Sequence, residues 1–172
     1  MGNATPTSSV RDTKIEHLMD IHGTSILRMC FAYLKDMGLA EDATQDTFIK
    51  AYQNLDNFEA AESWSEKAWL MRIAINTCKD YRRSAWFRHV DRSITPEEAL
   101  KLQSDMPQHE RVLLEDITLL APKYREVVLL YYYQDLRIAE IMKILGISRS
   151  AVYARLNRAQ ARLRGNLEGG NS

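Results

Sequence analysis

Apolar residues recur at every third or fourth position through most of this chain, and this spacing constrains its fold more than any other feature. One face of an α-helix repeats with this period, whereas a half-buried strand alternates at every second residue. Glycine and proline are also scarce, at 7 and 4 of the 172 residues, so few turn signals interrupt the helical pattern. The sequence therefore predicts an all-α fold.

The helical pattern breaks once, between residues 85 and 107, where Pro96 and Pro107 stand among charged residues. We interpret this segment as a flexible linker that joins two small helical domains. The domains are expected at 12–84 and 108–168. The polar N-terminus, 1–11, and the tail, 169–172, are predicted to be disordered.

The periodic positions predict three helices in the first domain and four in the second. They span about 12–35, 40–54, 64–84, 110–120, 122–134, 137–145 and 149–167. Gly38 is expected to end the first helix, and residues 56–63 are expected to form a loop. Gly146 and Ile147 should form a turn before Ser148, whose hydroxyl can cap the last helix.

The charges are segregated although the formal net charge is zero. Residues 36–62 contain seven acids and one base, whereas residues 64–92 contain seven Lys/Arg and three acids. Residues 148–164 contain five arginines and no acid. One acidic surface and two basic surfaces are expected. Two basic surfaces on separate domains favour a long polyanion that is contacted twice.

The last two helices and their glycine turn have the spacing of a helix-turn-helix, in which the second helix enters the DNA major groove. Its first turns would reach base edges, while arginines spaced along it would flank the groove and contact phosphates. The predicted base-edge group is Arg149, Ser150, Tyr153, Ala154 and Asn157. The predicted phosphate group is Arg155, Arg158 and Arg162. A helical hairpin with a solvated arginine face is the alternative.

The outer face of the helix at 64–84 carries a polar and basic stripe interleaved with aromatic residues. Aromatic platforms beside positive charge suit unpaired nucleic acid, because every base has a face on which to stack. The candidate residues are Trp69, Arg72, Asn76, Lys79, Arg82 and Arg83. The alternative is that the tryptophans belong to the core and the basic residues are merely solvated. Asp80 is expected to pair with a neighbouring arginine.

The outer face of the helix at 40–54 is acidic, yet it also carries an isoleucine and a tyrosine. Such a mixed patch is typical of a protein docking surface with electrostatic steering. The candidate residues are Glu41, Asp42, Gln45, Asp46, Ile49, Tyr52 and Gln53. The alternative is an acidic helix face that only contacts solvent.

The sequence contains no pattern that indicates a catalytic, cofactor-binding or metal site, so we expect neither an enzyme nor a small-molecule substrate. Cys30 and Cys78 lack metal-ligand spacing and lie on apolar helical stripes, which predicts buried, reduced thiols. No secretion signal follows Met1 and no apolar run could span a bilayer, so a cytoplasmic location is expected.

Four stretches resemble extracytoplasmic-function sigma factors, a subfamily of the sigma-70 family of bacterial RNA polymerase subunits. AEDATQDTFIKAY at 40–52, followed by LDNF at 55–58, resembles their regions 2.1–2.2. WLMRIAIN at 69–76 and DYRR at 80–83 resemble regions 2.3–2.4. LAPKYREV at 120–127 and IAEIMKILGIS at 138–148 resemble regions 4.1 and 4.2. The resemblance covers about 14–84 and 108–167, in order.

The resemblance implies a role for each candidate surface. The acidic helix would dock on the clamp helices of the largest core polymerase subunit. The helix at 64–84 and residues 56–63 would hold open the −10 promoter element, with one base flipped into a pocket. The last helix would read the −35 element, and its domain would meet the flap of the second subunit. An anti-sigma factor, often membrane-anchored, would compete for these surfaces and so control a stress response.

Two other functions fit the same residues. A stand-alone helix-turn-helix regulator would use residues 12–84 for sensing or dimerisation and would bind duplex DNA without a polymerase. A helical adaptor would bind only proteins, and its basic faces would have no DNA-dependent role.

Overall fold

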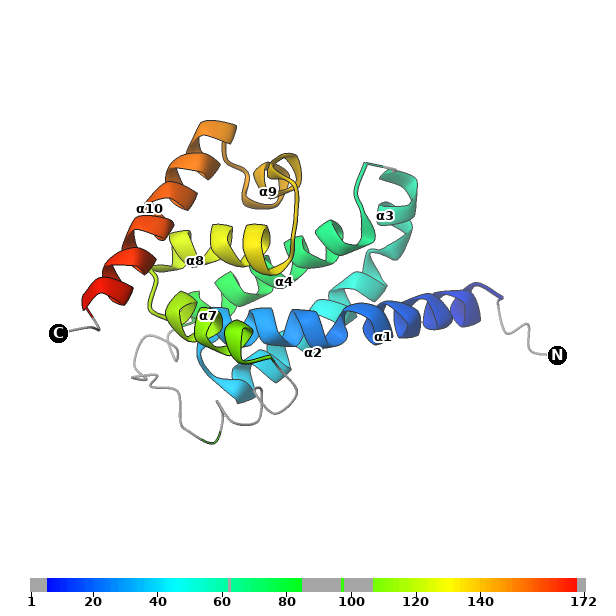
Figure 1. The fold of residues 1–172 in the computed structure, drawn as a ribbon. Helices are drawn as coiled ribbons and strands as arrows, with labels where there is room; N and C mark the ends of the chain where they lie inside the picture. Colours follow the sequence, from blue (N-terminus) through cyan, green and yellow to red (C-terminus); the bar gives the residue numbers. More distant parts are fainter. Residues whose placement is uncertain (1–5, 62, 85–96, 98–106, 170–172) are drawn as a thin grey trace.

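The computed structural model describes residues 6–61, 63–84, 97 and 107–169, and the regular elements within these ranges are all helices (Figure 1). The linker predicted at 85–107 and the tail beyond residue 169 lie almost wholly outside the described residues. None of the described helices is long and apolar enough to cross a lipid bilayer.

The first domain consists of α1 (Pro6–Leu34), α2 (Met37–Gln53), α3 (Leu55–Ala61) and α4 (Glu66–Arg83). Helix α2 packs against both α1 and α4. Ala40, Ala43 and Ala51 are completely buried, and such small side chains allow the α2 backbone to approach its neighbours closely. Cys30 and Cys78 are buried as predicted.

Helix α1 begins at Pro6, inside the segment 1–11 that the sequence predicts to be disordered. Arg11 explains this difference, because its guanidinium pairs with Asp56 and also lies 5.9 Å from the centre of the Tyr52 ring. Both partners belong to distant parts of the chain. Tertiary contacts therefore order a polar turn that local sequence does not favour.

The turn between α1 and α2 also differs from its prediction. Gly38 does not end the first helix, because it lies within α2. Helix α1 ends at Leu34, and Lys35 adopts a left-handed backbone with φ of 59°. Asp36 then caps α2, and its Oδ1 accepts a 2.7 Å hydrogen bond from the Leu39 N–H. The aspartate cap satisfies an otherwise unpaired amide and so moves the start of α2 ahead of the glycine.

The predicted loop at 56–63 is instead largely helical, because Leu55–Ala61 forms α3. Leu55 is buried at the start of this helix. Phe58 stacks on Trp69 of α4, with ring centroids 4.4 Å apart and planes 21° from parallel. These two anchors hold a short polar helix that has little stability of its own.

The second domain consists of α7 (Gln108–Thr118), α8 (Pro122–Val128), η1 (Leu129–Tyr133), α9 (Ile138–Leu145) and α10 (Arg149–Gly169). The helix predicted at 122–134 is one continuous run whose last part, η1, widens to π-helical geometry.

The turn between α9 and α10 has the predicted geometry. Gly146 takes a left-handed φ of 64°, which glycine adopts at little cost. The Ser148 hydroxyl accepts a 3.2 Å hydrogen bond from the Ala151 N–H. Val152, Leu156 and Ala159 face the core as expected from their spacing. The predicted helix-turn-helix is therefore present.

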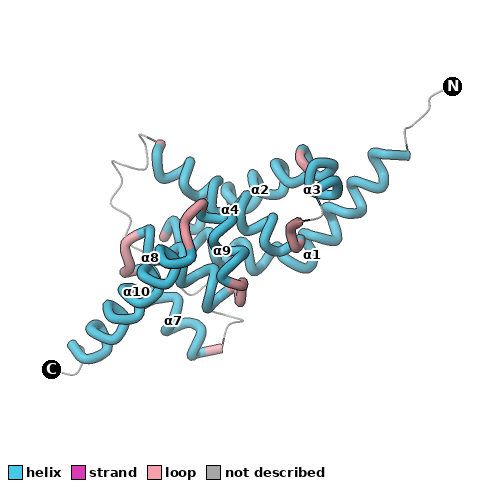
Figure 2. The backbone as a smooth tube through the Cα atoms, turned by 90° about the horizontal axis from the view of Figure 1, so that it is seen from above, coloured by secondary structure: helices cyan, strands magenta, loops and turns pink. Residues whose placement is uncertain are grey.

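The two domains pack directly against each other (Figure 2). Helices α7 and α8 contact α1, while α9 contacts α4. The contact is rich in polar groups, because Arg125, Glu126 and Gln134 of the second domain are all buried.

Candidate nucleic-acid interface

Helix α10 exposes most of the residues predicted to contact duplex DNA. Its described N-terminal turns follow the Ser148 cap, and the helix N-terminus favours a nearby phosphate. The exposed candidates are Arg149, Ser150, Tyr153, Ala154, Asn157, Arg158 and Arg162. Arg155 differs from them, because its side chain is only 29% exposed and lies 3.8 Å from a carboxylate oxygen of Glu126.

The basic face of α10 continues onto α8 through Tyr124. The Arg162 guanidinium lies 4.8 Å from the centre of the Tyr124 ring. Burial raises the pKa of the Tyr124 phenol, but a hydrogen bond with Arg158 and the charges of Lys123 and Arg162 outweigh it and hold this pKa below its ordinary value. The lowered pKa reports a positive potential that would also attract phosphates.

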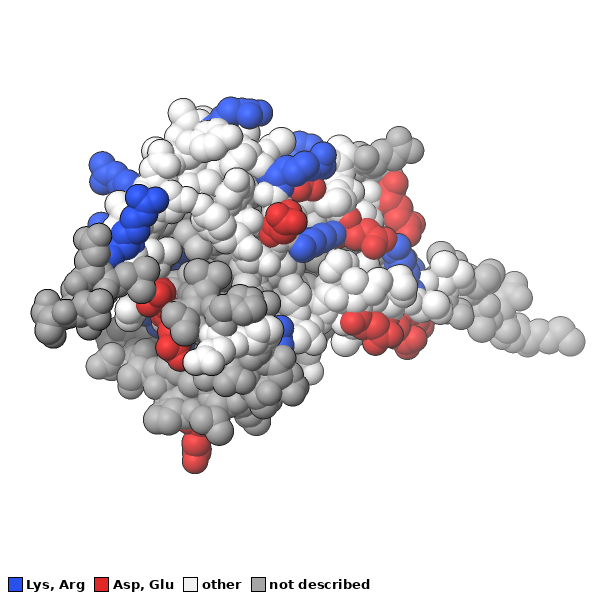
Figure 3. Space-filling model, viewed as in Figure 1, with Lys and Arg blue, Asp and Glu red and all other residues white. Residues whose placement is uncertain are grey.

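Figure 3 shows the resulting charge distribution on one face of the molecule. Lysine and arginine side chains gather over α9 and α10, whereas acidic side chains lie along the lower edge of α1 and around α3. The neutral total charge therefore conceals an uneven distribution of basic and acidic side chains on this face.

Helix α4 presents only part of its predicted nucleic-acid stripe to solvent. Arg72, Asn76 and Arg83 are exposed, and Asp80 lies 3.9 Å from Arg83 as expected. Arg82 is partly buried and its guanidinium lies 6.0 Å from the Tyr33 ring centre.

Trp69 was predicted on the outer face of α4 but belongs to the core, with 8% of its surface exposed. Trp69 lies at the boundary between the polar and apolar faces of the helix, so its spacing alone is compatible with an exposed position and with a core position. Phe58 of α3 stacks on the indole and makes it a core residue. The alternative in which this tryptophan is a core residue is therefore correct.

A cavity of about 310 Å³ lies between α3 and the exposed face of α4. Amide side chains supply both donors and acceptors around it, and indole and phenyl rings supply flat apolar walls. Its lining residues are Asn54, Asn57, Phe58, Trp64, Trp69, Arg72, Ile73 and Asn76. This combination can hold one planar, hydrogen-bonding group such as an unstacked nucleobase.

Sequence reasoning missed Asn54 and Asn57 as site residues, because Asn54 was expected at the end of a helix and Asn57 in the loop that follows it. Two asparagines three positions apart, directly before Phe58, are the signal that could have identified this wall. Trp64 borders the same cavity, and Arg72 lies 5.3 Å from its ring centre.

The acidic face of α2 is largely exposed, as predicted. Glu41, Asp42, Gln45, Ile49 and Gln53 are exposed, and Ile49 retains 52% of its surface despite being apolar.

The other two docking candidates on α2 have partners within the domain. Arg11 covers one face of the half-buried Tyr52, and Asp46 accepts a 2.7 Å hydrogen bond from the Tyr81 hydroxyl. Burial and this hydrogen bond raise the pKa of Tyr81. Asp46 therefore has a structural role as well as a place on the candidate docking surface.

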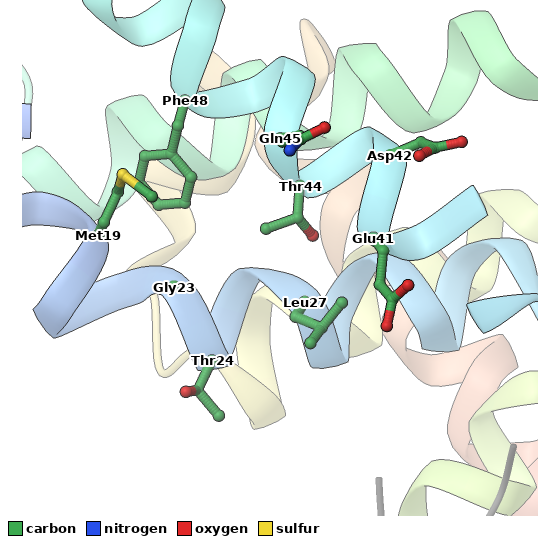
Figure 4. A pocket seen from close by; sticks show the side chains of 9 residues that line it. All are labelled: Met19, Gly23, Thr24, Leu27, Glu41, Asp42, Thr44, Gln45 and Phe48. Atoms are coloured by element: carbon green, nitrogen blue, oxygen red, sulfur yellow. The ribbon is translucent and has the colours of Figure 1, made fainter. Parts of the chain in front are cut away.

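A hollow of about 540 Å³ runs between α1 and α2 beside this acidic face (Figure 4). Met19 and Leu27 of α1 and Phe48 of α2 form its apolar part, and Glu41 and Asp42 border it. A second hollow of about 310 Å³ shares Met19, Gln45 and Phe48 and extends to Ile49 and Tyr52. Together they form a groove with an apolar floor and an acidic border.

The two domains each match a known protein family. Residues 18–88 match sigma-70 region 2, and residues 111–163 match sigma-70 region 4. The chain is 32% identical over 161 residues to the ECF RNA polymerase sigma factor SigW of Bacillus subtilis, covering 86% of this chain and 85% of SigW. It is 30% identical over 151 residues to the ECF RNA polymerase sigma factor SigL of Mycobacterium tuberculosis, covering 86% of this chain and 85% of SigL.

Solved structures agree with this assignment. CnrH in complex with the cytosolic domain of CnrY is 26% identical with a TM-score of 0.68, covering 94% of this chain and 91% of CnrH. The sigma factor RpoE of Bartonella quintana, solved with the anti-sigma factor NepR, has the same fold at 22% identity and a TM-score of 0.74, covering 92% of this chain and 98% of RpoE.

Both domains match sigma regions in the order that the sequence motifs indicated, which sets aside the stand-alone regulator and the protein-only adaptor. The chain therefore belongs to the ECF family of RNA polymerase sigma factors, the subunits that direct core polymerase to promoters and start transcription there.

Proposed function

We propose that each of three surfaces has one role in promoter recognition. Helix α10 reads the −35 element as duplex, and the α3–α4 cavity with the basic face of α4 holds the −10 element open. The acidic face and groove of α2 dock on the clamp helices of the largest polymerase subunit. The cavity carries this proposal, since an amide-lined and aromatic-walled hollow beside Arg72 suits an unpaired base.

The mechanism is positioning and strand separation, without chemistry of its own. Flipping a base out of the stack costs a few kcal/mol. Stacking on an aromatic ring recovers about 1–3 kcal/mol per base, and contacts between Arg72 or Arg83 and phosphates add a salt-dependent contribution. Binding to the −35 element and to core polymerase supplies the remaining free energy and fixes the DNA where it opens.

The second domain would also contact the flap of the second-largest subunit, and an anti-sigma factor would compete for the same surfaces. Both structural relatives were solved with another protein bound, which supports such a partner. The apolar groove between α1 and α2 is suited to either partner, because an amphipathic helix binds by placing its apolar face in such a groove.

The decisive experiment is promoter-specific transcription with purified core polymerase, comparing wild type with Asp42→Arg. Asp42 is exposed at the border of the groove, and unlike Asp46 it accepts no hydrogen bond from Tyr81. Charge reversal should weaken core binding by at least about tenfold, because like-charge contacts across an interface cost several kcal/mol. Affinity is measured by titrating labelled factor with core enzyme.

Asp12→Arg is the matched control, because Asp12 is exposed on α1 and does not line the groove. Equal core affinity for Asp42→Arg and the control would show that docking uses another surface. A wild-type protein that starts transcription at no specific site would overturn the proposed function itself.

Base-reading and phosphate-contacting residues of α10 should respond differently to substitution. Arg149→Ala or Asn157→Ala is expected to weaken binding to the cognate −35 sequence by about 1–3 kcal/mol and to relax its specificity. Arg158→Ala should weaken binding to all sequences alike and reduce the slope of log affinity against log salt by about one unit. Binding of duplexes across a salt series measures both. A change of base preference with an unchanged salt slope in Arg158→Ala would contradict these roles.

A further inference from the structure

The N-terminal half of α1 runs beside α3 and the start of α4 (Figure 1), and ion pairs join it to both helices. The Arg11 guanidinium pairs with Asp56 of α3, and its Nε donates a 3.2 Å hydrogen bond to Oδ1 of that carboxylate. Lys14, one helical turn later, pairs with Glu66 in the first turn of α4. Two cations on one side of α1 therefore hold the two helices between which the −10 cavity lies.

The contact between Arg11 and Asp56 is the more specific of the two ion pairs. Both oxygens of the carboxylate accept an N–H of the guanidinium, which also lies 5.9 Å from the centre of the Tyr52 ring. Two donors of one planar group fix the orientation of a carboxylate, whereas a lysine ammonium acts as a single point charge. The hydrogen bond holds the pKa of Asp56 below its ordinary value, so the pair stays charged at neutral pH.

Helix α3 depends on such contacts because it has only seven residues, and a helix of this length has little stability of its own. Leu55 is buried and Phe58 stacks on Trp69, which fixes the inner side of α3. Asp56 lies roughly 200° around the helix from Phe58, on the opposite face. Its pairing with Arg11 therefore restrains the rotation of α3 that the inner contacts leave free.

The orientation of α3 determines the shape of the −10 cavity. Asn57 and Phe58 line the cavity from α3, and Asn54 lines it directly before this helix. Asn57 is the immediate neighbour of Asp56, so a rotation of α3 moves the Asn57 amide relative to the α4 side of the cavity. Hydrogen bonds weaken steeply as their angle departs from linearity, so even a small rotation would reduce recognition of a base.

We propose that Arg11 is a positioning residue for recognition of the −10 element, and that it acts through Asp56 and α3 without contacting DNA. This inference rests on the proposed function of the cavity between α3 and α4. It gives a role in promoter opening to the end of the polar segment 1–11, which the sequence alone predicts to be disordered.

Asp56→Asn is the most informative substitution, because positioning and simple electrostatics predict opposite results for it. It removes an exposed negative charge close to the proposed DNA-binding cavity, so electrostatics alone would strengthen binding. A neutral amide cannot hold the guanidinium through two acceptor oxygens, so we expect affinity to fall about fivefold. The measurement is a titration of core polymerase carrying the variant with a forked promoter fragment that is unpaired at the −10 element.

Glu59→Gln is the matched control, because it removes another exposed acid of α3 that does not pair with Arg11. Its affinity for the forked fragment should equal or exceed that of wild type. Arg11→Gln should weaken binding as much as Asp56→Asn, and combining the two should cause no further loss, since both break one contact. In Asp56→Asn, affinities for core polymerase and for a duplex carrying only the −35 element should stay within about twofold of wild type.

Hydrogen exchange provides a second measurement that needs no DNA. Amides of Leu55–Ala61 should exchange at least about threefold faster in Asp56→Asn, while those of Glu66–Arg83 should be unchanged. Wild-type exchange in α3 would overturn the role of Arg11. So would a forked-fragment affinity of Asp56→Asn equal to that of Glu59→Gln.

Asn57→Ala distinguishes failure of this inference from failure of the proposed function. It removes an amide from the cavity wall and leaves the ion pair of Asp56 intact, so it should weaken binding of the same forked fragment. If Asn57→Ala binds normally, the cavity does not hold the −10 element and both proposals fail. If Asn57→Ala binds weakly while Asp56→Asn binds like wild type, only the positioning role of Arg11 is wrong.

Discussion

Replacing Arg125 with alanine is expected to lower the free energy of unfolding by about 3–5 kcal/mol. Arg125 is 5% exposed, and its guanidinium donates to three backbone carbonyl oxygens. Its NH2 group donates to Thr118 at 2.9 Å and to Leu120 at 2.8 Å, and its NH1 group donates to Tyr33. Removing it leaves buried acceptors without donors and opens a cavity at the α7–α8 corner.

Burial lowers the pKa of Arg125 to about 10, so the side chain keeps its charge at neutral pH and its donors remain available. Denaturant unfolding, monitored by circular dichroism, measures the loss. Arg164→Ala, at an exposed arginine of α10, should change stability by less than about 0.5 kcal/mol. A loss below about 1 kcal/mol in Arg125→Ala would mean that water replaces these hydrogen bonds.

Trp69→Ala should mainly lower stability, whereas Trp64→Ala should mainly weaken DNA binding. Trp69 is buried against Phe58, so its truncation should cost about 3–5 kcal/mol of folding free energy and release α3 from α4. Trp64 is half-buried at the cavity, so its truncation should cost less stability but weaken binding of an unpaired −10 strand by about 1–3 kcal/mol.

Thermal unfolding and binding of a forked promoter fragment in the presence of core polymerase separate the two effects. Each tryptophan serves as the control for the other, because the same truncation is made only five residues away. If Trp69→Ala had wild-type stability but failed to bind the unpaired strand, Trp69 would be a nucleic-acid contact and not a core residue.

The sequence by itself determined most of the helices, the helix-turn-helix and the segregation of charge along the chain. These features are local, because apolar spacing sets which face of a helix is buried, and a left-handed glycine with a serine cap sets the turn at 146–148. The exposed candidates on α2 and α10 follow from the same periodicity. Positions such as Arg72 and Asn76 were likewise predictable, since they lie opposite the buried side of α4.

Only the tertiary structure decided which of the candidate surface residues are buried or paired within the protein. Trp69 became a core residue because Phe58 covers it, and residues 55–61 became a helix because Leu55 and Phe58 are anchored. Lys79 and Arg155 are 76 positions apart, and nothing in their local sequence indicates that both meet Glu126. Helix formation depends on neighbours in the sequence, whereas the meeting of distant charges depends on how the domains pack.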